Sequence, residues 1–582
     1  MTGKTGKFES KLFSGRCEAL RRRVAGEMVA HSNLFESGPA VRMLHYLRKI
    51  ATPPRKGVRV TLLCRWLRNH AEAVRWVELR QVGYTKSFLR CFFTKKRQEK
   101  SDRKKRKMEE KTMIKAAPTE LGEKSIGKLL RQYAVPAIIA MTASSLYNMV
   151  DSIFIGQGVG SLAISGLAVT FPLMNISAAF GSLVGVGASA LVSMLLGQRN
   201  YGVARRVLGN VMTMNVVLGV LLMFFGLVFL DPILYFFGAS DNTIGYAKEY
   251  MIYILIGNVV THLYLGLNAV IRASGRPKVA MWATIFTVVV NAILDPLFIF
   301  VFDMGIKGAA IATVLAQILA LTWQLRLLSN KNEVLHFENG KVFTFDGKIA
   351  RESLKIGLSP FLMNMASCFV VLLINNQLRK YGDQMGEGVG DLAIGAYGIV
   401  NRIIFLFVMV VLGFTQGMQP IAGYNYGAGK HDRVMKVFWQ TVLWATITTT
   451  IGFLVGTFCP RFAVSLFAND PTMIDIAARG FTIVVVAFPI VGFQIVASNF
   501  FQSIGMANKA IFLSLSRQVL FLIPCLVLVP MWLGIEGVWV AMPVSDTVAT
   551  IVAGVLIWGL VHKFKKSPSS VGFKGVGEEV EK

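Results

Sequence analysis

Long apolar runs recur along most of this chain, and they constrain its fold more than any other feature. Each has about 20 residues, enough for a helix rising 1.5 Å per residue to cross a hydrocarbon layer of ~30 Å. Twelve runs lie near residues 133–157, 162–195, 206–230, 245–271, 279–302, 308–328, 355–378, 392–422, 436–459, 480–504, 510–532 and 537–562. Lipid tails offer no hydrogen-bond partners to backbone N–H and C=O groups. Such runs must therefore form helices, in which these groups bond to one another. The sequence therefore predicts an all-α polytopic membrane protein with twelve transmembrane helices.

Composition excludes several other classes of protein. Of the 582 residues, 53% are hydrophobic and 16% are charged, whereas soluble domains carry about 25% charged residues. The six cysteines show no metal or disulfide spacing. We find no phosphate-binding G-x-x-x-x-G-K-[ST] loop and no nucleophilic triad pattern. We therefore expect neither an enzyme nor a bound cofactor.

The net charge of +29 is concentrated in a basic leader, residues 1–112, which holds 29 Lys and Arg against 10 Asp and Glu. It ends in the runs Lys95–Arg97 and Arg103–Lys107. Three interpretations stay open: an arm attracted to anionic lipid, a nucleic-acid-binding tail, or upstream sequence before a functional start at Met108 or Met113. We favour the last, assign the leader no function and expect no nucleic-acid partner.

Basic residues in the short connections predict the orientation of the chain, because Lys and Arg there stay in the cytoplasm. They follow the second, fourth, sixth, eighth and twelfth runs: Arg199, Arg205, Arg206, Arg272, Arg276, Lys278, Lys331, Lys341, Lys348, Arg351, Lys355, Lys430, Arg433, Lys436, Lys563, Lys565 and Lys566. The opposite connections are more acidic and include Asp231, Asp303, Asp391, Asp470 and Glu536. We expect a multi-pass protein of the cytoplasmic (inner) membrane with both termini in the cytoplasm.

The two halves of the chain repeat one another. The segment from Leu162 matches that from Leu392, Gly197 matches Gly427, and Gly275 matches Gly505, all at an offset of 230. Copies of six spans each start on the same side of the membrane, so an axis along the membrane normal relates them, and a transporter holds substrate in the cleft between such lobes. The predicted parts are the leader, an N-terminal lobe (113–328), a cytoplasmic linker (329–354), a C-terminal lobe (355–562) and a cytoplasmic tail (563–582).

Carboxylates inside the apolar runs are the strongest candidate functional residues, because an ionised side chain at a helix centre is costly. Asp151 in the first run and Asp295 in the fifth are expected at similar depth, with Thr313 of the sixth run. Tyr147 and Asn291 each precede a carboxylate by one helical turn. Such a group can bind a proton or coordinate Na⁺, and we expect no other metal. Helix bridging is the structural alternative.

The second lobe is less acidic. Asn375 takes the place near which the first lobe has Asp151, and Arg402 lies within the eighth run. Further polar residues that could line a cleft are Gln416, Gln419, Gln494, Asn499, Gln502, Arg517 and Gln518. Asp546 could neutralise one of the two arginines. Each of these could instead bridge helices.

These features together resemble the multidrug and toxic compound extrusion (MATE) transporters. The resemblance covers about residues 125–562 and rests on the duplicated lobes, on Val150–Gly156, on the paired loops at Gly197 and Asn425, and on Asn291-x-x-x-Asp295.

The resemblance implies a first-lobe cation site, typical of the prokaryotic branch, at Asp151, Asn291, Asp295 and Thr313. Tyr147 would be its neighbour and Pro136 the point at which helix one bends. It also implies a monomer in membrane lipid that exchanges outward-moving, drug-like organic cations for inward H⁺ or Na⁺ by alternating access.

Two alternatives remain. A lipid-linked saccharide flippase of the same superfamily would share the lobes but line its cleft with several cationic residues. A non-transporting membrane sensor or scaffold would tolerate loss of Asp151 and Asp295. The substrate and the choice between H⁺ and Na⁺ stay open.

Overall fold

The computed structural model describes residues 119–159, 161–337, 342–386, 389–467 and 470–566. The leader and most of the predicted tail lie outside these residues. Throughout the described residues the secondary structure is helical, with no strand.

The first half of the described chain runs from α5 to α13. Its helices are α5 (Glu120–Glu123), α6 (Ile126–Gly158), α7 (Ser161–Gly197), α8 (Tyr201–Val228), α9 (Leu230–Phe236), α10 (Ile244–Ile256), α11 (Asn258–Ala273), α12 (Pro277–Pro296), the π-helix η2 (Leu297–Val301) and α13 (Gly305–Leu328).

The second half repeats this order from α14 to α23. Its helices are α14 (Gly347–Gly382), α15 (Val389–Gly427), α16 (His431–Phe458), α17 (Pro460–Ser465), α18 (Pro471–Val485), α19 (Phe488–Ser503), α20 (Ala507–Leu515), the π-helix η4 (Ser516–Leu522), α21 (Ile523–Leu528), α22 (Pro530–Leu533) and α23 (Ile535–Lys566).

The predicted set of spans is confirmed. Among the described residues, nine helices are long and apolar enough to cross a membrane, and two bent helix pairs raise the number to eleven. The first predicted span falls on α6, which is not among these helices, although its 33 residues exceed the length of about 20 that a crossing needs.

The irregular features of the fold recur in both halves, which supports the internal repeat. The pair α10–α11 bends by 56° and the pair α18–α19 by 59°. Short α9 and α17 stand at equivalent places, each directly after a long span.

The repeated loop anchors have a backbone reason. Gly275 and Gly505 have φ angles of 99° and 74°, and Gly305 and Gly534 have 58° and 57°. Residues other than glycine rarely adopt this left-handed backbone conformation. Equivalent turns in the two halves therefore have glycine at equivalent positions.

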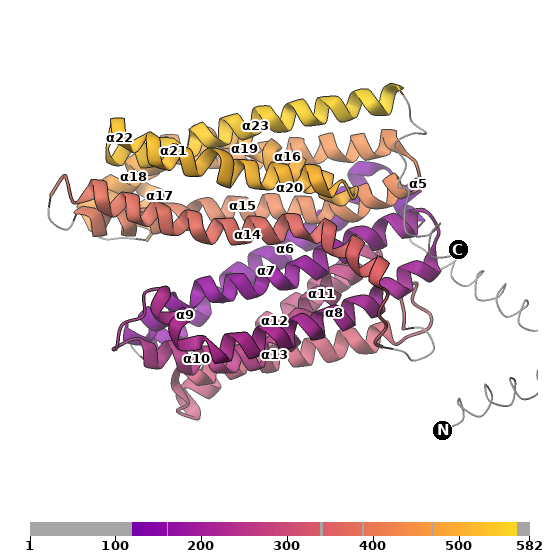
Figure 1. Ribbon diagram of the computed structural model, residues 1–582, viewed down its shortest axis with the longest axis horizontal. Helices are drawn as coiled ribbons and strands as arrows, with labels where there is room; N and C mark the ends of the chain where they lie inside the picture. The colour runs from indigo at the N-terminus through magenta and orange to yellow at the C-terminus, as the bar shows by residue number, and fades with distance from the viewer. Residues whose placement is uncertain (1–118, 160, 338–341, 387–388, 468–469, 567–582) are drawn as a thin grey trace, which may run out of the picture. The chain divides into compact units, whose positions relative to one another are not determined.

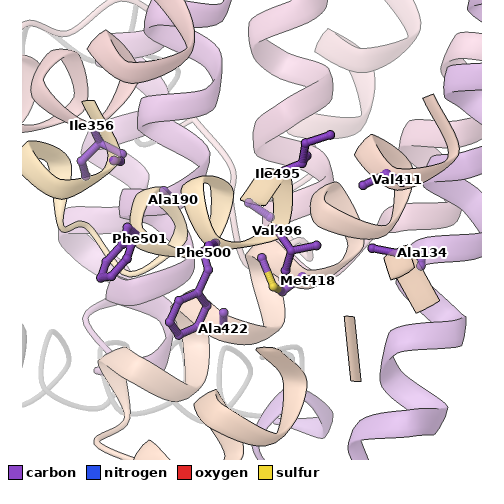
Figure 2. Close-up of a cluster of buried hydrophobic side chains, with 14 of the residues drawn as sticks. Ala134, Ala190, Ile356, Val411, Met418, Ala422, Ile495, Val496, Phe500 and Phe501 are labelled. Atoms are coloured by element: carbon purple, nitrogen blue, oxygen red, sulfur yellow. The ribbon is translucent and has the colours of Figure 1, made fainter. Parts of the chain in front are cut away.

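The helices form two lobes that share a core (Figure 1). The second lobe is drawn in orange to yellow above the first lobe in indigo to pink, and α6 and α7 pack against α15 and α14. Figure 2 shows part of this core, where Met418 and Ala422 of α15 lie among side chains of α19 such as Val496 and Phe500.

Contact between the lobes is closest at one end of the bundle, which we call the basic end because the Lys- and Arg-rich connections lie there. An added Cβ at Gly197 would overlap the carbonyl oxygen of Tyr424, and one at Gly427 would overlap that of Met194. The offset of 230 relates these two contacts. Small residues let helix backbones approach in this way, so the interface between the lobes follows the pseudo-symmetry of the chain.

The segment before α6 packs on the second lobe, although its sequence belongs to the first half. The carbonyl oxygen of Leu121 accepts hydrogen bonds from Asn425 Nδ2 (2.9 Å) and Arg433 Nη2 (3.1 Å), and that of Gly122 accepts one from Lys430 Nζ (2.9 Å). The N-terminal end of α6 is thereby tied to the second lobe.

Candidate functional site

Four of the predicted site residues form a buried cluster inside the first lobe. Asp151 of α6, Asn291 and Asp295 of α12, and Thr313 of α13 are 5%, 1%, 0% and 9% exposed. Asn291 Nδ2 donates to Asp295 Oδ1 over 2.9 Å and to Thr313 Oγ1 over 3.3 Å. We call these four residues the carboxylate cluster. The two carboxylates lie close enough to repel one another.

Local sequence explains how α12 presents its part of the cluster. Asn291 and Asp295 are four residues apart on one helical face. Pro296 follows directly and has no backbone N–H to donate. The helix then widens into η2, where Phe302 N donates to Leu297 O over 3.0 Å. π-Helical turns of this kind are frequent at functional sites.

The cluster holds oxygen atoms that no described residue satisfies. Asp151 Oδ1, Asn291 Oδ1 and Asp295 Oδ2 are buried and have no hydrogen-bond partner among the described side chains. Neither carboxylate belongs to any of the ion pairs found among the described residues. Buried charges need a compensating partner, so the arrangement suits a bound proton or a hard cation that prefers oxygen ligands.

The structure does not test the predicted roles of two other residues of helix one, Tyr147 and Pro136. Tyr147 lies on α6, but its side chain falls outside the described residues. Pro136 is buried, and α6 continues through it without a break. Bending at Pro136 stays a prediction.

The side of α15 that meets the first lobe near the basic end is exposed toward the opposite end. Arg402, Gly413 and Gly427 lie on one face of α15, because 11 and 25 residues are close to whole numbers of turns at 3.6 residues each. At Gly413 an added Cβ would lie 2.5 Å from Ile138 of α6, whereas at Gly398 it would meet nothing within 4 Å. Arg402 and its neighbour Leu406, which is 47% exposed, are likewise uncovered. Among the described residues, this face of α15 is therefore covered by the first lobe at Gly413 and uncovered at Arg402.

The three predicted cleft residues all lie on faces turned toward the other lobe. Arg402 is exposed. Asn375 shares a face of α14 with Gly357, which packs on α7; it is half-buried and its Oδ1 has no partner among the described residues. Gln416 lies where the lobes meet, with its Nε2 3.0 Å from Met141 Sδ of α6.

The remaining polar residues of the second lobe mostly bridge helices. Gln419 Nε2 donates to Ser189 Oγ of α7 over 2.9 Å and so links the lobes. Arg517 Nε donates to Asp546 Oδ1 over 2.7 Å, which confirms the expected neutralisation of an arginine. Helices η4 and α23 that hold this pair are the second-lobe equivalents of those that hold Asn291, Asp295 and Thr313.

We expect the Arg517–Asp546 pair to stabilise the second lobe. Asp546→Asn should lower the unfolding free energy by about 2–3 kcal/mol, because it leaves a partly buried guanidinium without its counter-charge. This is less than the roughly 3–5 kcal/mol for fully buried pairs, because the Arg517 side chain is 30% exposed. Thermal unfolding of purified protein measures the change. The double variant Arg517→Met with Asp546→Leu should recover most of the loss, and an equal loss in both variants would contradict this role.

Sequence reasoning missed one buried polar cluster in the first lobe. Ser177 Oγ of α7 donates to Asn258 Oδ1 over 2.5 Å, and His262 Nε2 lies 3.0 Å from the carbonyl oxygen of Ser177. Asn258 and His262 stand one turn apart, next to the bend between α10 and α11. A histidine one turn from an asparagine in an apolar run was the available signal.

Comparison with known proteins places the chain in a family. Residues 136–297 and 385–527 match the sequence model of the MatE family. The chain is 26% identical over 452 residues to the multidrug export protein MepA of Staphylococcus haemolyticus, covering 77% of this chain and 97% of that protein. It is 25% identical over 440 residues to MepA of Staphylococcus aureus strain NCTC 8325, covering 75% and 94%.

Solved structures agree. The MATE multidrug transporter DinF-BH, solved in complex with R6G, is 34% identical with a TM-score of 0.69, covering 75% of this chain and 96% of that one. An outward-facing MATE family transporter of the MOP superfamily shares the fold at 22% identity, with a TM-score of 0.71 and coverage of 78% and 98%. With two thirds or more of these chains covered and both lobes matched, this protein belongs to the MATE family of membrane transporters.

Proposed function

We propose that this chain is a multidrug exporter in which inward movement of H⁺ or Na⁺ drives outward movement of organic cations. The observation that carries the proposal is the carboxylate cluster, with its two acidic side chains and three unsatisfied oxygens in the interior of one lobe. The printed names of the relatives, multidrug export protein and multidrug transporter, support the substrate class.

Electrostatics supports a coupling role for the cluster. Two carboxylates that repel one another in a site without a basic partner are stabilised when a proton or Na⁺ accompanies them. Inward transfer of one positive charge across the membrane supplies about 2.3 kcal/mol per 100 mV. Asp151 and Asp295 therefore bind the coupling cation, with Asn291 and Thr313 as neutral oxygen ligands, Tyr147 as their neighbour and no other metal ion required.

The position of the cluster supports an indirect form of coupling. On α6, the cleft-facing side holds Ala134 and Ile138, which contact Gly417 and Gly413 of α15. Asp151 lies 13 residues after Ile138, about 140° around the helix, and so faces into the first lobe. Cation and substrate thus occupy different places, and cation binding reshapes the first lobe through α6, with Pro136 as the bending point. Such coupling is a reciprocal free energy between two sites.

The contacts between the lobes support alternating access. The glycine contacts close the path between the lobes at the basic end, and we place its opening at the opposite end, where Arg402 is exposed. With the basic end in the cytoplasm, as the positive-inside rule predicts, this is an outward-open state of a monomer in the inner membrane, with both termini cytoplasmic. A flippase for a lipid-linked saccharide is less well supported, because Asp546 neutralises Arg517 and leaves Arg402 as the cleft's exposed arginine.

Transport by the purified full chain in proteoliposomes tests the proposal. We impose either a pH gradient or a Na⁺ gradient and expect a fluorescent organic cation to move in the direction opposite to H⁺ or Na⁺. The gradient that drives this movement identifies the coupling ion. Collapse of that gradient by an ionophore should stop transport. Equal fluxes with and without either gradient, in protein that unfolds cooperatively, would contradict an antiporter.

A further inference from the structure

Two hollows meet on the surface of the second lobe at the basic end. The first, of about 270 Å³, is lined by Glu352, Lys355 and Ile356 of α14 and by residues 505–509. The second, of about 420 Å³, is lined by five apolar residues of α20 and η4, namely Ile511, Phe512, Leu515, Val519 and Leu520. Asn508 lines both hollows, so they adjoin one another, and together we call them the α20 groove.

The head of the α20 groove is positively charged. Lys355 is paired with Glu352 over 2.7 Å. Lys509 lies with its Nζ 5.1 Å from the centre of the Phe501 ring and close enough to Lys563 of α23 to be repelled by it. Among the described residues, neither Lys509 nor Lys563 pairs with a carboxylate. Three lysines against one glutamate leave a net positive charge that an anion would neutralise.

The rest of the α20 groove is apolar and has the length of one leaflet. Phe512, Val519 and Leu520 are 46%, 40% and 54% exposed. From Asn508 to Leu520 a helix rises about 18 Å, close to half of the ~30 Å hydrocarbon layer. The π-helical turn η4 widens the helix at the far end of the groove and so broadens the apolar face.

We propose that the α20 groove binds an anionic phospholipid from the leaflet at the basic end. The lipid phosphate lies between Lys355 and Lys509, with Lys563 nearby, and one acyl chain follows Ile511, Leu515 and Val519. A lipid matches the groove because its charge and its apolar chain are joined at the spacing that the lysines and the apolar residues show. Anionic head groups gain about 1 kcal/mol per nearby Lys, which is about fivefold in affinity.

The first lobe does not repeat this site. At the offset of 230, Lys278 at the start of α12 corresponds to Asn508, and Val279 corresponds to Lys509. Lys278 is exposed at the same end of the bundle, so Lys278→Ala removes a positive charge at the equivalent place. It serves as the matched control.

Native mass spectrometry of the purified full chain tests the proposal. With mixed phosphatidylglycerol and phosphatidylcholine, we expect preferential binding of phosphatidylglycerol. The double variant Lys355→Ala with Lys509→Ala should bind phosphatidylglycerol about 25-fold more weakly, at about fivefold per lysine, while Lys278→Ala should bind as the wild type does. Phosphatidylglycerol with a photoactivatable acyl chain should label residues 511–520.

The proposal is overturned if the two lipids bind equally, or if the double variant keeps wild-type affinity. Labelling spread evenly over the apolar spans would also overturn it, because the groove would then not be distinguished from the rest of the lipid-facing surface. These readouts measure lipid binding and do not depend on transport.

Discussion

Asp295→Asn is expected to reduce gradient-driven export to below about a tenth of the wild-type rate, and Asp151→Asn to do the same. An amide cannot take up a proton or supply the negative charge that a Na⁺ ligand set needs. Asp295 is fully buried, and its Oδ2 has no partner among the described residues. Flux of a fluorescent organic cation in proteoliposomes, under the gradient that drives the wild type, measures the effect.

Thermal unfolding of the same variants separates a coupling role from helix bridging. Removing one of two repelling buried charges should raise the melting temperature by about 2 °C or more when no coupling cation is bound. If Na⁺ is the coupling ion, added Na⁺ should stabilise the wild type, because it binds the folded state, and should fail to stabilise Asp295→Asn.

Asp391→Asn is the matched control for these variants. Asp391 pairs with Arg379 on the exposed surface, where the two side chains are 70% and 64% exposed. Such pairs contribute about 0–1 kcal/mol, so transport and stability should stay near wild type. Wild-type export by Asp295→Asn would contradict coupling through the carboxylate cluster, and a large loss of stability in both buried variants would support helix bridging.

The carboxylate cluster could be predicted from sequence because the bilayer makes its residues conspicuous. Asp151 and Asp295 interrupt apolar runs in which a carboxylate is costly, and the one-turn spacing of Asn291 from Asp295 puts both on one face of α12. The membrane also fixes the depth of Thr313, since each span starts at a known side. These constraints are local or one-dimensional, so a single sequence carries them.

Other features depend on contacts between distant helices and could not be predicted. Examples are the hydrogen bonds that Gln419 donates and the packing of Leu121 on the second lobe. Both depend on which helix faces meet, and helix periodicity does not specify the partner face. The Ser177–Asn258–His262 cluster was missed for the same reason, because only the bend between α10 and α11 brings its two helices together in that way. Which glycines lie at the interface between the lobes was not apparent from sequence for the same reason.

Substitution of a glycine at the interface between the lobes is also expected to have a large effect on export. Gly417→Ala should reduce export to below about a tenth of the wild-type rate. An added Cβ there would lie 2.6 Å from the Cα of Ala134, a backbone atom that cannot rotate away. Overpacking of this kind costs about 1–3 kcal/mol. The cost applies to the state in which the lobes meet at the basic end, so the substitution shifts the population away from that state.

Solvent accessibility distinguishes a population shift from misfolding. A cysteine introduced at Gln416 lies beside this contact, and it should react faster with a thiol reagent added from the basic end when Gly417 is alanine. A shift of 1.4 kcal/mol changes the equilibrium between the two states by about tenfold, so the reaction rate reports the shift directly. The melting temperature should change little if the alternative state is equally well packed.

Gly398→Ala is the matched control on the same helix, at a position about 100° around it from Gly417. No described residue lies within 4 Å of the added Cβ at Gly398. Alanine there should leave export and thiol reactivity at wild-type values, while its helix propensity stabilises α15 by up to about 1 kcal/mol relative to glycine. Equal losses of export at Gly398 and Gly417 would contradict overpacking as the cause, because the added methyl group at Gly398 meets no described residue.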